Sequence, residues 1–363
     1  MARSVALQRL TERVKNARDA GTALDIRGGG TKCFYGNEPR GDALDVRELS
    51  GITSYEPTEL VVTALAGTPL AELEAVLANR GQCLPFEPPR FAPAGTVGGM
   101  VAAGLAGPAR ASVGPLRDFV LGVTLLNGVG ETLTFGGQVM KNVAGYDVSR
   151  LIAGSMGILG VICQVSVKVM PSLPACRTLC FELDEADALQ RLNRWAGQAI
   201  PLSASAWYEG RLWVRLAGAK AAVADMHERL GGRDLEPQAA RSWWSEVRDH
   251  RHAFFAIAAG DLQRGECLWR LSVPDTAPPL SLPGAQFIEW GGAQRWWRTT
   301  APALQMRAAA TAVGGHATLV RAADKSSGAF ASLPHSLLQV HRRLKQAFDP
   351  EGIFNPGRMY PEL

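Results

Sequence analysis

The sequence predicts an α+β protein built of two parts, and three observations lead to this fold class. Two glycine-rich turns follow strand-like segments in the first half, and neither has the G-x-G-x-x-G spacing of a doubly wound nucleotide-binding fold. The texture of the chain changes at residues 171–174, where two prolines interrupt it. Strand-like and helical segments alternate after that point, as in a small antiparallel sheet with helices on one face. A length of 363 residues agrees with two packed parts or with one large unit that carries an inserted lid.

The first part is predicted to begin with an amphipathic helix at residues 4–20, where apolar residues recur at helical spacing. A proline in its first turn and Gly81 after its end delimit a second helix at residues 69–79. Two strand-like segments flank Gly128 and Gly130, and we expect them to pair as a hairpin. The other predicted elements are a short helix that begins near Thr96, a helix at 146–155, and strands at 24–26, 43–46, 59–67 and 160–170.

The second part is predicted to form a ferredoxin-like βαββαβ unit. It begins with a strand at 178–183 and a helix at 185–196, followed by a hairpin at 203–218 that turns at Glu209 and Gly210. The rest comprises a helix at 219–230, later strands at 267–273 and 285–290, and two further helices at 301–313 and 334–348.

Composition and charge exclude several classes of protein. A net charge of +4 is too small to indicate binding to nucleic acid. The N-terminal residues carry charges throughout, and no apolar run is long enough to span a bilayer. We therefore expect a cytoplasmic protein that reaches the inner face of the cell membrane only through partners. Six scattered cysteines without a C-x-x-C pair are typical of reduced thiols, and we predict no metal site.

The first glycine-rich turn, DIRGGGTK, spans residues 25–32. Successive N–H groups of a turn without Cβ atoms can converge on one anion, and Arg27 and Lys32 add positive charge. A phosphate group fits this pattern, although a tight surface turn without a ligand is the alternative. The second turn, GTVGG, opens a helix and offers further N–H groups together with the positive end of the helix dipole. Two such turns suggest a dinucleotide.

Several motifs resemble a known family. They are IRGGGTK, PAGTVGG followed by VGPLRDFVLG, NVAGYDVSRLIAGSMGILGVI and the terminal FDPEGIFNPGRM. Their order and spacing are similar to the FAD-contact segments of the vanillyl-alcohol oxidase and p-cresol methylhydroxylase-type (PCMH-type) flavoproteins. Within that family the chain most resembles the FAD-binding E-type subunits of bacterial glycolate oxidases (glycolate dehydrogenases). The segments PTELVVTALAGTPL, CLPFEPP, FGGQVMKNVAGYD and GGHAT extend this similarity nearly from end to end.

The resemblance implies a domain organisation and a cofactor site. It implies a PCMH-type FAD-binding domain at residues 1–172 with two subdomains that divide near residue 55, a reduced cap at 173–300, and a C-terminal tail at 301–363 that returns to the FAD domain. Non-covalent FAD is expected because Thr31 occupies the position where some relatives carry a flavin-linked histidine. The implied FAD contacts are Arg27, Gly28, Gly29, Gly30, Thr31, Lys32, Pro93, Ala94, Gly95, Thr96, Val97, Gly98, Gly99, Gly114, Gly157, Gly160, Val161, Ile162 and Asn355.

Two departures from the family pattern affect the predicted chemistry. Met156 stands where many relatives carry glutamate, and the metal-ligating H-x-G-D-G-N segment of catalytic relatives is missing. His316 in GGHAT is therefore the candidate base for the hydroxyl proton, with Arg321 as the candidate group for a substrate carboxylate. A histidine that only packs at the lid is the alternative. Two other histidines, in the segment at residues 248–252, are interpreted as part of a solvated helix end.

The resemblance implies a subunit that oxidises glycolate, a 2-hydroxy acid, to glyoxylate. A larger FAD-binding glycolate oxidase subunit and an iron–sulphur subunit are the expected partners. This FAD either oxidises the 2-hydroxy acid itself or relays electrons, and the missing histidine segment favours relay. Two other functions remain open, namely a flavin-free assembly module of the same complex and an independent FAD-dependent alcohol oxidase.

Overall fold

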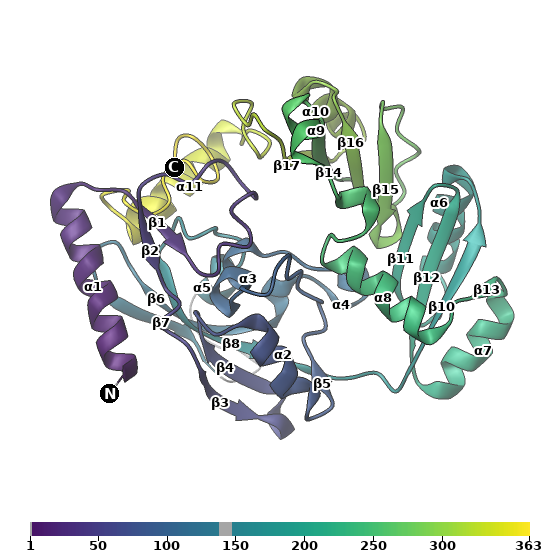
Figure 1. The fold of residues 1–363 in the computed structure, drawn as a ribbon, viewed down its shortest axis with the longest axis horizontal. Helices are drawn as coiled ribbons and strands as arrows, with labels where there is room; N and C mark the ends of the chain where they lie inside the picture. The colour runs from purple at the N-terminus through teal and green to yellow at the C-terminus, as the bar shows by residue number, and fades with distance from the viewer. Residues whose placement is uncertain (1, 138–146) are drawn as a thin grey trace.

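The fold is described from a computed structural model, which covers residues 2–137 and 147–363. The chain forms two parts that face one another, with the purple-to-blue N-terminal part on one side and the teal-to-green cap on the other (Figure 1). The yellow C-terminal segment returns from the cap to the N-terminal part. The predicted helix at 146–155 partly falls on residues 138–146, which lie outside the described residues.

The chain begins with a helix and a small parallel sheet. The helix α1 (Ala2–Ala20) packs through Leu10 and Val14 on the pair formed by β1 (Leu24–Arg27) and β2 (Asp42–Asp45). Leu24 also bridges in parallel to Phe354 in the C-terminal tail. The first and last segments of the chain are therefore joined beside the first glycine-rich turn.

A five-stranded antiparallel sheet forms the rest of the first part, in the order β3-β4-β8-β6-β7. Leucines of α2 and apolar residues of α3 and α5 pack against one face of this sheet and build its core. The elements are β3 (Ile52–Glu56), β4 (Val61–Leu65), α2 (Leu70–Ala78), β5 (Gln82–Cys83), α3 (Val97–Ala103), α4 (Arg110–Val113), β6 (Val120–Leu126), β7 (Thr132–Gly136), α5 (Val148–Ile152), β8 (Val161–Lys168) and β9 (Met170–Pro171).

The cap is an eight-stranded antiparallel sheet in the order β13-β10-β12-β11-β15-β16-β14-β17. Read from the outer edge to the centre, the two halves of this sheet are β13-β10-β12-β11 and β17-β14-β16-β15, so their strands follow the same order. β11 and β15 pair at the centre and join the two halves. The elements are β10 (Ala175–Glu182), α6 (Glu185–Ala196), β11 (Leu202–Tyr208), β12 (Arg211–Gly218), α7 (Lys220–Leu230), β13 (Arg233–Asp234), α8 (Pro237–Arg248), α9 (Ala259–Gln263), β14 (Cys267–Ser272), β15 (Ala285–Glu289), β16 (Gln294–Thr299), α10 (Ala303–Ala312) and β17 (His316–Arg321).

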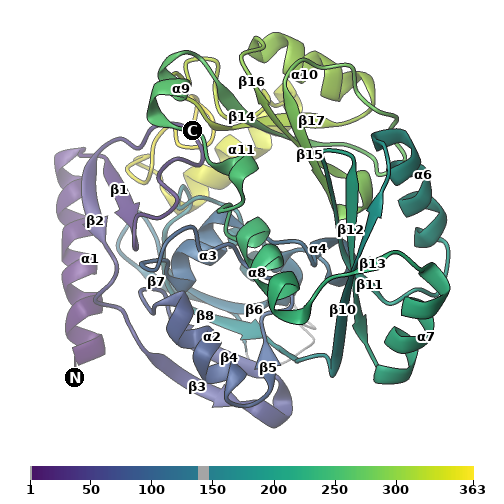
Figure 2. The same ribbon diagram turned by 45° about the vertical axis from the view of Figure 1, so that its right-hand side comes forward.

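The cap differs from the small sheet expected from the sequence. We expected the strand at 285–290 to belong to the same βαββαβ unit as the strand at 178–183. In the structure, the strand that pairs with the outer side of β10 is instead the two-residue β13. The sheet also continues past residue 300, because β17 pairs with β14 and α10 packs beside it. Helices α6, α7 and α10 cover the outer face of the sheet, while α8 lies on the face turned toward the first part (Figure 2).

The last helix, α11 (His335–Phe348), fixes the tail to the first part through a buried ion pair. The Lys345 Nζ atom donates to the Asp349 carboxylate at 2.7 Å and to the carbonyl oxygens of Ile158 at 2.8 Å and Phe354 at 2.7 Å. The same carboxylate accepts from the amides of Ile353 and Phe354. Every donor of this ammonium group is thus used to join α11, the turn before β8 and the tail.

Among the described residues, none of the helices is long and apolar enough to cross a bilayer.

Replacing Lys345 by alanine is expected to lower the free energy of unfolding by about 3 to 5 kcal/mol, because it leaves the Asp349 carboxylate buried without its cation. Arg343→Ala on the exposed side of α11 is the matched control and should change the stability by less than about 0.5 kcal/mol. Urea denaturation of the two variants measures the difference. Equal stabilities would show that the buried pair does not hold the tail.

Candidate functional site

The first glycine-rich turn, α3 and the C-terminal tail line one cavity in the first part of the molecule. Nine of the residues expected to contact FAD lie on its wall, namely Arg27, Gly28, Gly29, Gly30, Thr31, Lys32, Thr96, Gly99 and Asn355. Wall residues that the sequence did not single out include Tyr35, Pro39, Ala102 and Arg358. The cavity is therefore built by segments that lie more than three hundred residues apart in the chain.

The amides of the first turn have no acceptor within the described part of the chain. Before this stretch, the amide of Ile26 donates to the Asn355 side chain. After it, the amide of Cys33 donates to the carbonyl of Gly30 at 3.3 Å. The five consecutive N–H groups of residues 28–32 make none of the hydrogen bonds found among the described residues. Four of these five residues are partly buried, where an N–H group without an acceptor is costly, so this stretch is suited to an anionic ligand.

The two glycine-rich turns touch each other. A Cβ atom added to Gly29 would overlap the carbonyl group of Ala94, and one added to Gly28 would overlap the side chain of Thr96. Neither position has a positive φ, so close approach is what requires glycine, with a backbone at Gly29 and with the Thr96 side chain at Gly28.

The second turn offers fewer free amides than the sequence suggested. Gly95, Val97 and Gly98 donate to backbone carbonyls of neighbouring segments, and Gly99 donates to the Thr96 hydroxyl at 3.2 Å, which caps α3. These bonds fix α3 on the end of β4. Only Ala94 and Thr96 keep amides that make no hydrogen bond to the described residues.

Two cations of the cavity, Lys32 and Arg358, lack a carboxylate partner among the described residues, and Arg358 donates to backbone carbonyls instead. The Arg27 guanidinium is paired with the buried Asp25 carboxylate, whereas the Lys32 Nζ atom lies 5.7 Å from the centre of the Phe91 ring and 3.5 Å from the Thr31 hydroxyl. Burial lowers the pKa of Lys32 to about 8. An anion beside Lys32 would stabilise its protonated form.

The C-terminal tail supplies the opposite wall. The Asn355 side chain accepts from the amide of Ile26 at 2.8 Å and donates to the carbonyl of Met156 at 2.7 Å. Arg358 is only 7% exposed, and its guanidinium donates to the carbonyl of Cys33 at 3.0 Å. The tail thus holds β1 and the segment after the first turn in place. Gly157 allows this contact, because a Cβ atom there would lie 2.7 Å from the Asn355 amide nitrogen.

The remaining predicted FAD contacts lie outside the wall of this cavity. Val161 and Ile162 are buried in the cores on either side of β8, and Gly160 packs against Leu125. Gly114 ends α4 near Asp118. Pro93, Ala94, Gly95, Val97 and Gly98 form the second turn behind Thr96. Packing explains why these positions carry small or apolar residues.

The predicted catalytic pair does not lie together. His316 is exposed at the start of β17, where it pairs with Ser272. Arg321 lies at the other end of that strand, and its guanidinium carbon is 3.8 Å from the centre of the Phe34 ring. Burial lowers the pKa of both groups. His316 borders the face of the cap that carries Arg270, whose charge adds to the lowering of its pKa.

His250 is not part of a solvated helix end, as the sequence suggested. It follows α8 with a φ of +54°, and its ring stacks on Phe255 with the ring centres 4.2 Å apart. The ring edges of Phe91 and Trp296 meet it at nearly right angles. Burial lowers the pKa of His250 to about 3, so the imidazole is neutral at physiological pH. No sequence signal marks this position, because charged residues surround it in the chain.

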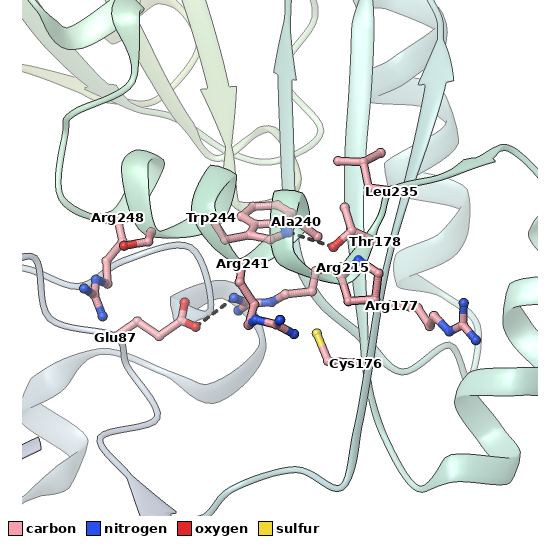
Figure 3. A pocket seen from close by; sticks show the side chains of 12 residues that line it. Glu87, Cys176, Arg177, Thr178, Arg215, Leu235, Ala240, Arg241, Trp244 and Arg248 are labelled. Carbon is pink, nitrogen blue, oxygen red and sulfur yellow. Dashed lines mark hydrogen bonds and ion pairs between the residues drawn. The ribbon is translucent and has the colours of Figure 1, made fainter. Parts of the chain in front are cut away.

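A second cleft between the two parts carries four arginines (Figure 3). In this view Arg215 and Arg241 lie side by side near Cys176. Arg215 contacts the Glu87 carboxylate at 2.8 Å, Arg177 contacts Asp234 at 2.7 Å, and Arg248 contacts Asp249 at 2.8 Å. Arg241 donates to Gln238. Three of these arginines are thus paired with carboxylates of the chain, and the pair of Arg215 with Glu87 joins the cap to the first part.

Comparison with protein families assigns the two ends of the chain. Residues 6–136 match an FAD binding domain, and residues 330–359 match the C-terminal domain of FAD linked oxidases. The fold is also similar to alkyldihydroxyacetonephosphate synthase, with a TM-score of 0.62 and 17% identity over 96% of this chain and 74% of that chain. The α+β fold of an FAD-binding oxidase is thereby confirmed.

Relatives with known names agree with this assignment. The glycolate oxidase subunit GlcD of Bacillus subtilis is 29% identical over 45% of this chain and 35% of its own length. The D-lactate dehydrogenase of Archaeoglobus fulgidus is 29% identical over 52% of this chain and 43% of its own. The glycolate oxidase subunit GlcE of Escherichia coli is 45% identical over 98% of both chains. The chain therefore belongs to the family of the glycolate oxidase subunit GlcE, within the FAD-linked oxidases.

Proposed function

We propose that this protein is the FAD-binding subunit of a heteromeric glycolate oxidase, which oxidises glycolate to glyoxylate and passes the electrons to an iron–sulphur subunit. The observation that carries the proposal is the 45% identity to a GlcE subunit over 98% of both chains. A larger FAD-binding subunit and the iron–sulphur subunit would be its partners. The same proposal includes an FAD domain at 1–172 and a cap with a ferredoxin-like half. The returning tail would begin after β17 rather than at residue 301, since α10 and β17 extend the cap.

The described residues fit FAD as the cofactor. The free amides of residues 28–32 and the Lys32 ammonium would bind one phosphate, while Ala94 and Thr96 would donate to the other. Asn355 and Arg358 would keep the turn in place rather than bind the phosphates, because their polar atoms already contact the chain. Bound FAD would supply the acceptor for the two electrons of the 2-hydroxy acid. The attachment would be non-covalent, since Thr31 cannot form a histidyl link.

The purified protein is expected to be yellow and to release its flavin on denaturation. Absorbance spectra before and after acid precipitation measure both properties. A colourless protein whose melting temperature does not rise with added FAD would contradict the proposal and favour a flavin-free assembly module. Flavin that stays in the precipitate would contradict the non-covalent attachment alone.

Anaerobic addition of glycolate to the FAD-loaded chain is expected to bleach the flavin absorbance, because the reduced cofactor absorbs less in the visible range. Acetate, which lacks the hydroxyl group, is the matched control and should leave the spectrum unchanged. Bleaching that requires the larger subunit would assign electron relay to this chain. Turnover with other alcohols but not with glycolate would instead favour an independent oxidase.

Lys32→Gln is expected to weaken FAD binding about 10-fold to 100-fold, because it removes a charge-assisted hydrogen bond to phosphate. The melting temperature of the FAD-free variant should not fall, since Lys32 has no carboxylate partner among the described residues. Lys220→Gln at the exposed start of α7 is the matched control. Fluorescence titration of FAD measures the affinity, and equal affinities of the two variants would exclude Lys32 from the site.

The affinity for FAD is expected to fall as the pH rises above 8. Burial lowers the pKa of Lys32 to about 8 in the FAD-free protein, so the ammonium group is charged below that pH and neutral above it. Binding of a phosphate requires the charged form of Lys32, so above pH 8 the protein must take up a proton when FAD binds. The affinity for FAD then falls by about tenfold per pH unit, until the pH reaches the pKa of Lys32 in the FAD-bound protein. Titrations between pH 6 and 10 test this dependence. The Lys32→Gln variant should lack it, and a flat profile for the unaltered protein would contradict it.

A further inference from the structure

A small cavity between the first part and the cap is surrounded by polar nitrogen atoms without a partner. Its wall includes Phe34, Tyr35, Phe91, His250, Arg270 and Trp296. The Nδ1 atom of His250 and the Nε atom of Arg270 are buried and make no hydrogen bond within the described residues, and the Nε atom of Arg321 behind Phe34 is in the same state. Buried polar atoms are nearly always paired, so two unpaired nitrogens on the wall of one small cavity point to a ligand.

Arg270 on the wall of this cavity and Arg321 behind Phe34 both lack a carboxylate partner among the described residues. Arg270 projects from β14, between its ladder partners Trp296 and Thr318, and donates to the Tyr35 hydroxyl at 3.0 Å. Neither Arg270 nor Arg321 forms an ion pair with a described carboxylate. This differs from the cleft in Figure 3, where Arg177, Arg215 and Arg248 each form an ion pair. A guanidinium that keeps free N–H donors in a small cavity is suited to a carboxylate.

His250 adds a neutral hydrogen-bonding group next to that charge. Aromatic rings enclose it on several sides, and the neighbouring Asp249 carboxylate is occupied by Arg248 and by the amide of Arg90. The charges of Arg321 and Arg270 add to burial in keeping the imidazole unprotonated. A neutral imidazole nitrogen can accept a hydrogen bond from a hydroxyl group. A ligand that satisfies both groups carries a carboxylate and an adjacent hydroxyl.

The cavity lies next to the proposed cofactor site. Tyr35 belongs to the walls of both cavities, and Phe91 separates the Lys32 ammonium from the smaller one. A small molecule held there would be adjacent to the cofactor, on the side of the cap.

We propose that this cavity binds a short 2-hydroxy acid, whose carboxylate contacts Arg270 and whose hydroxyl group donates to His250. The choice of a 2-hydroxy acid as the ligand rests on the proposed function. In this assignment His250, rather than His316, is the histidine that contacts the ligand. His316 then borders the site from the exposed start of β17.

The test is equilibrium binding of glycolate, acetate and oxalate to the full chain, followed by tryptophan fluorescence, because Trp296 lines the cavity. The unaltered protein should bind glycolate at least tenfold more tightly than acetate. Arg270→Gln should weaken the binding of all three anions by at least tenfold, and Arg270→Lys, which keeps the charge, should restore part of it. His250→Asn should remove the preference for glycolate over acetate, and asparagine suits this position because it tolerates a positive φ.

Arg241→Gln is the matched control, since Arg241 lies in the other arginine-lined cleft and is exposed. It should bind the three anions like the unaltered protein. Weaker binding in Arg241→Gln with normal binding in Arg270→Gln would overturn the proposal, as would equal affinities for glycolate and acetate in the unaltered protein. Loss of FAD from folded Arg270→Gln and His250→Asn would also overturn it, because the cavity would then hold part of the cofactor. A colourless chain that still binds glycolate in this manner would contradict the proposed function but not this site.

Discussion

Five backbone amides that find no acceptor in the described part of the chain determine how the rest of this structure is organised. The turn at residues 28–32 can keep them free only while other groups hold its backbone, since a loop of three glycines gains little from its own side chains. The second turn supports it from one side through contacts that leave no room for a Cβ atom at Gly29. The C-terminal tail supports it from the other side through Asn355 and Arg358. The cavity thus exists because three distant segments meet.

The buried charges of the molecule fall into two groups with different roles. Lys345 uses all three of its donors, one of them in the pair with Asp349, and each nitrogen of the Arg295 guanidinium donates to a backbone carbonyl, with Pro278 and Gly292 among the acceptors. These side chains join segments of the fold. Lys32 and Arg270 lack a carboxylate partner among the described residues and line cavities. The uncompensated cations therefore mark the places where an anion would bind.

The sequence predicted the elements whose signals are local. The helix α6 coincides with the predicted range because Asp184 caps it and its apolar face has helical spacing. The hairpin turns at Glu209 and Gly210, which both have positive φ as its two-residue turn requires. Strand β16 was missed, because Arg295 interrupts its apolar pattern and only the structure shows that its guanidinium is buried against carbonyl groups. His250 was misjudged for a similar reason. Its charged neighbours in the sequence predict a solvent-exposed side chain, whereas most of the rings that surround it come from distant parts of the chain.

The most direct test of the central claim is hydrogen exchange of the amides at residues 28–32, measured by mass spectrometry or NMR with and without FAD. These amides should exchange rapidly in the FAD-free protein and slow by at least tenfold when FAD is bound, while the amides of Val97 and Gly98, which already have acceptors, should change little. FAD that binds tightly without protecting residues 28–32 would contradict the claim that this turn holds the cofactor.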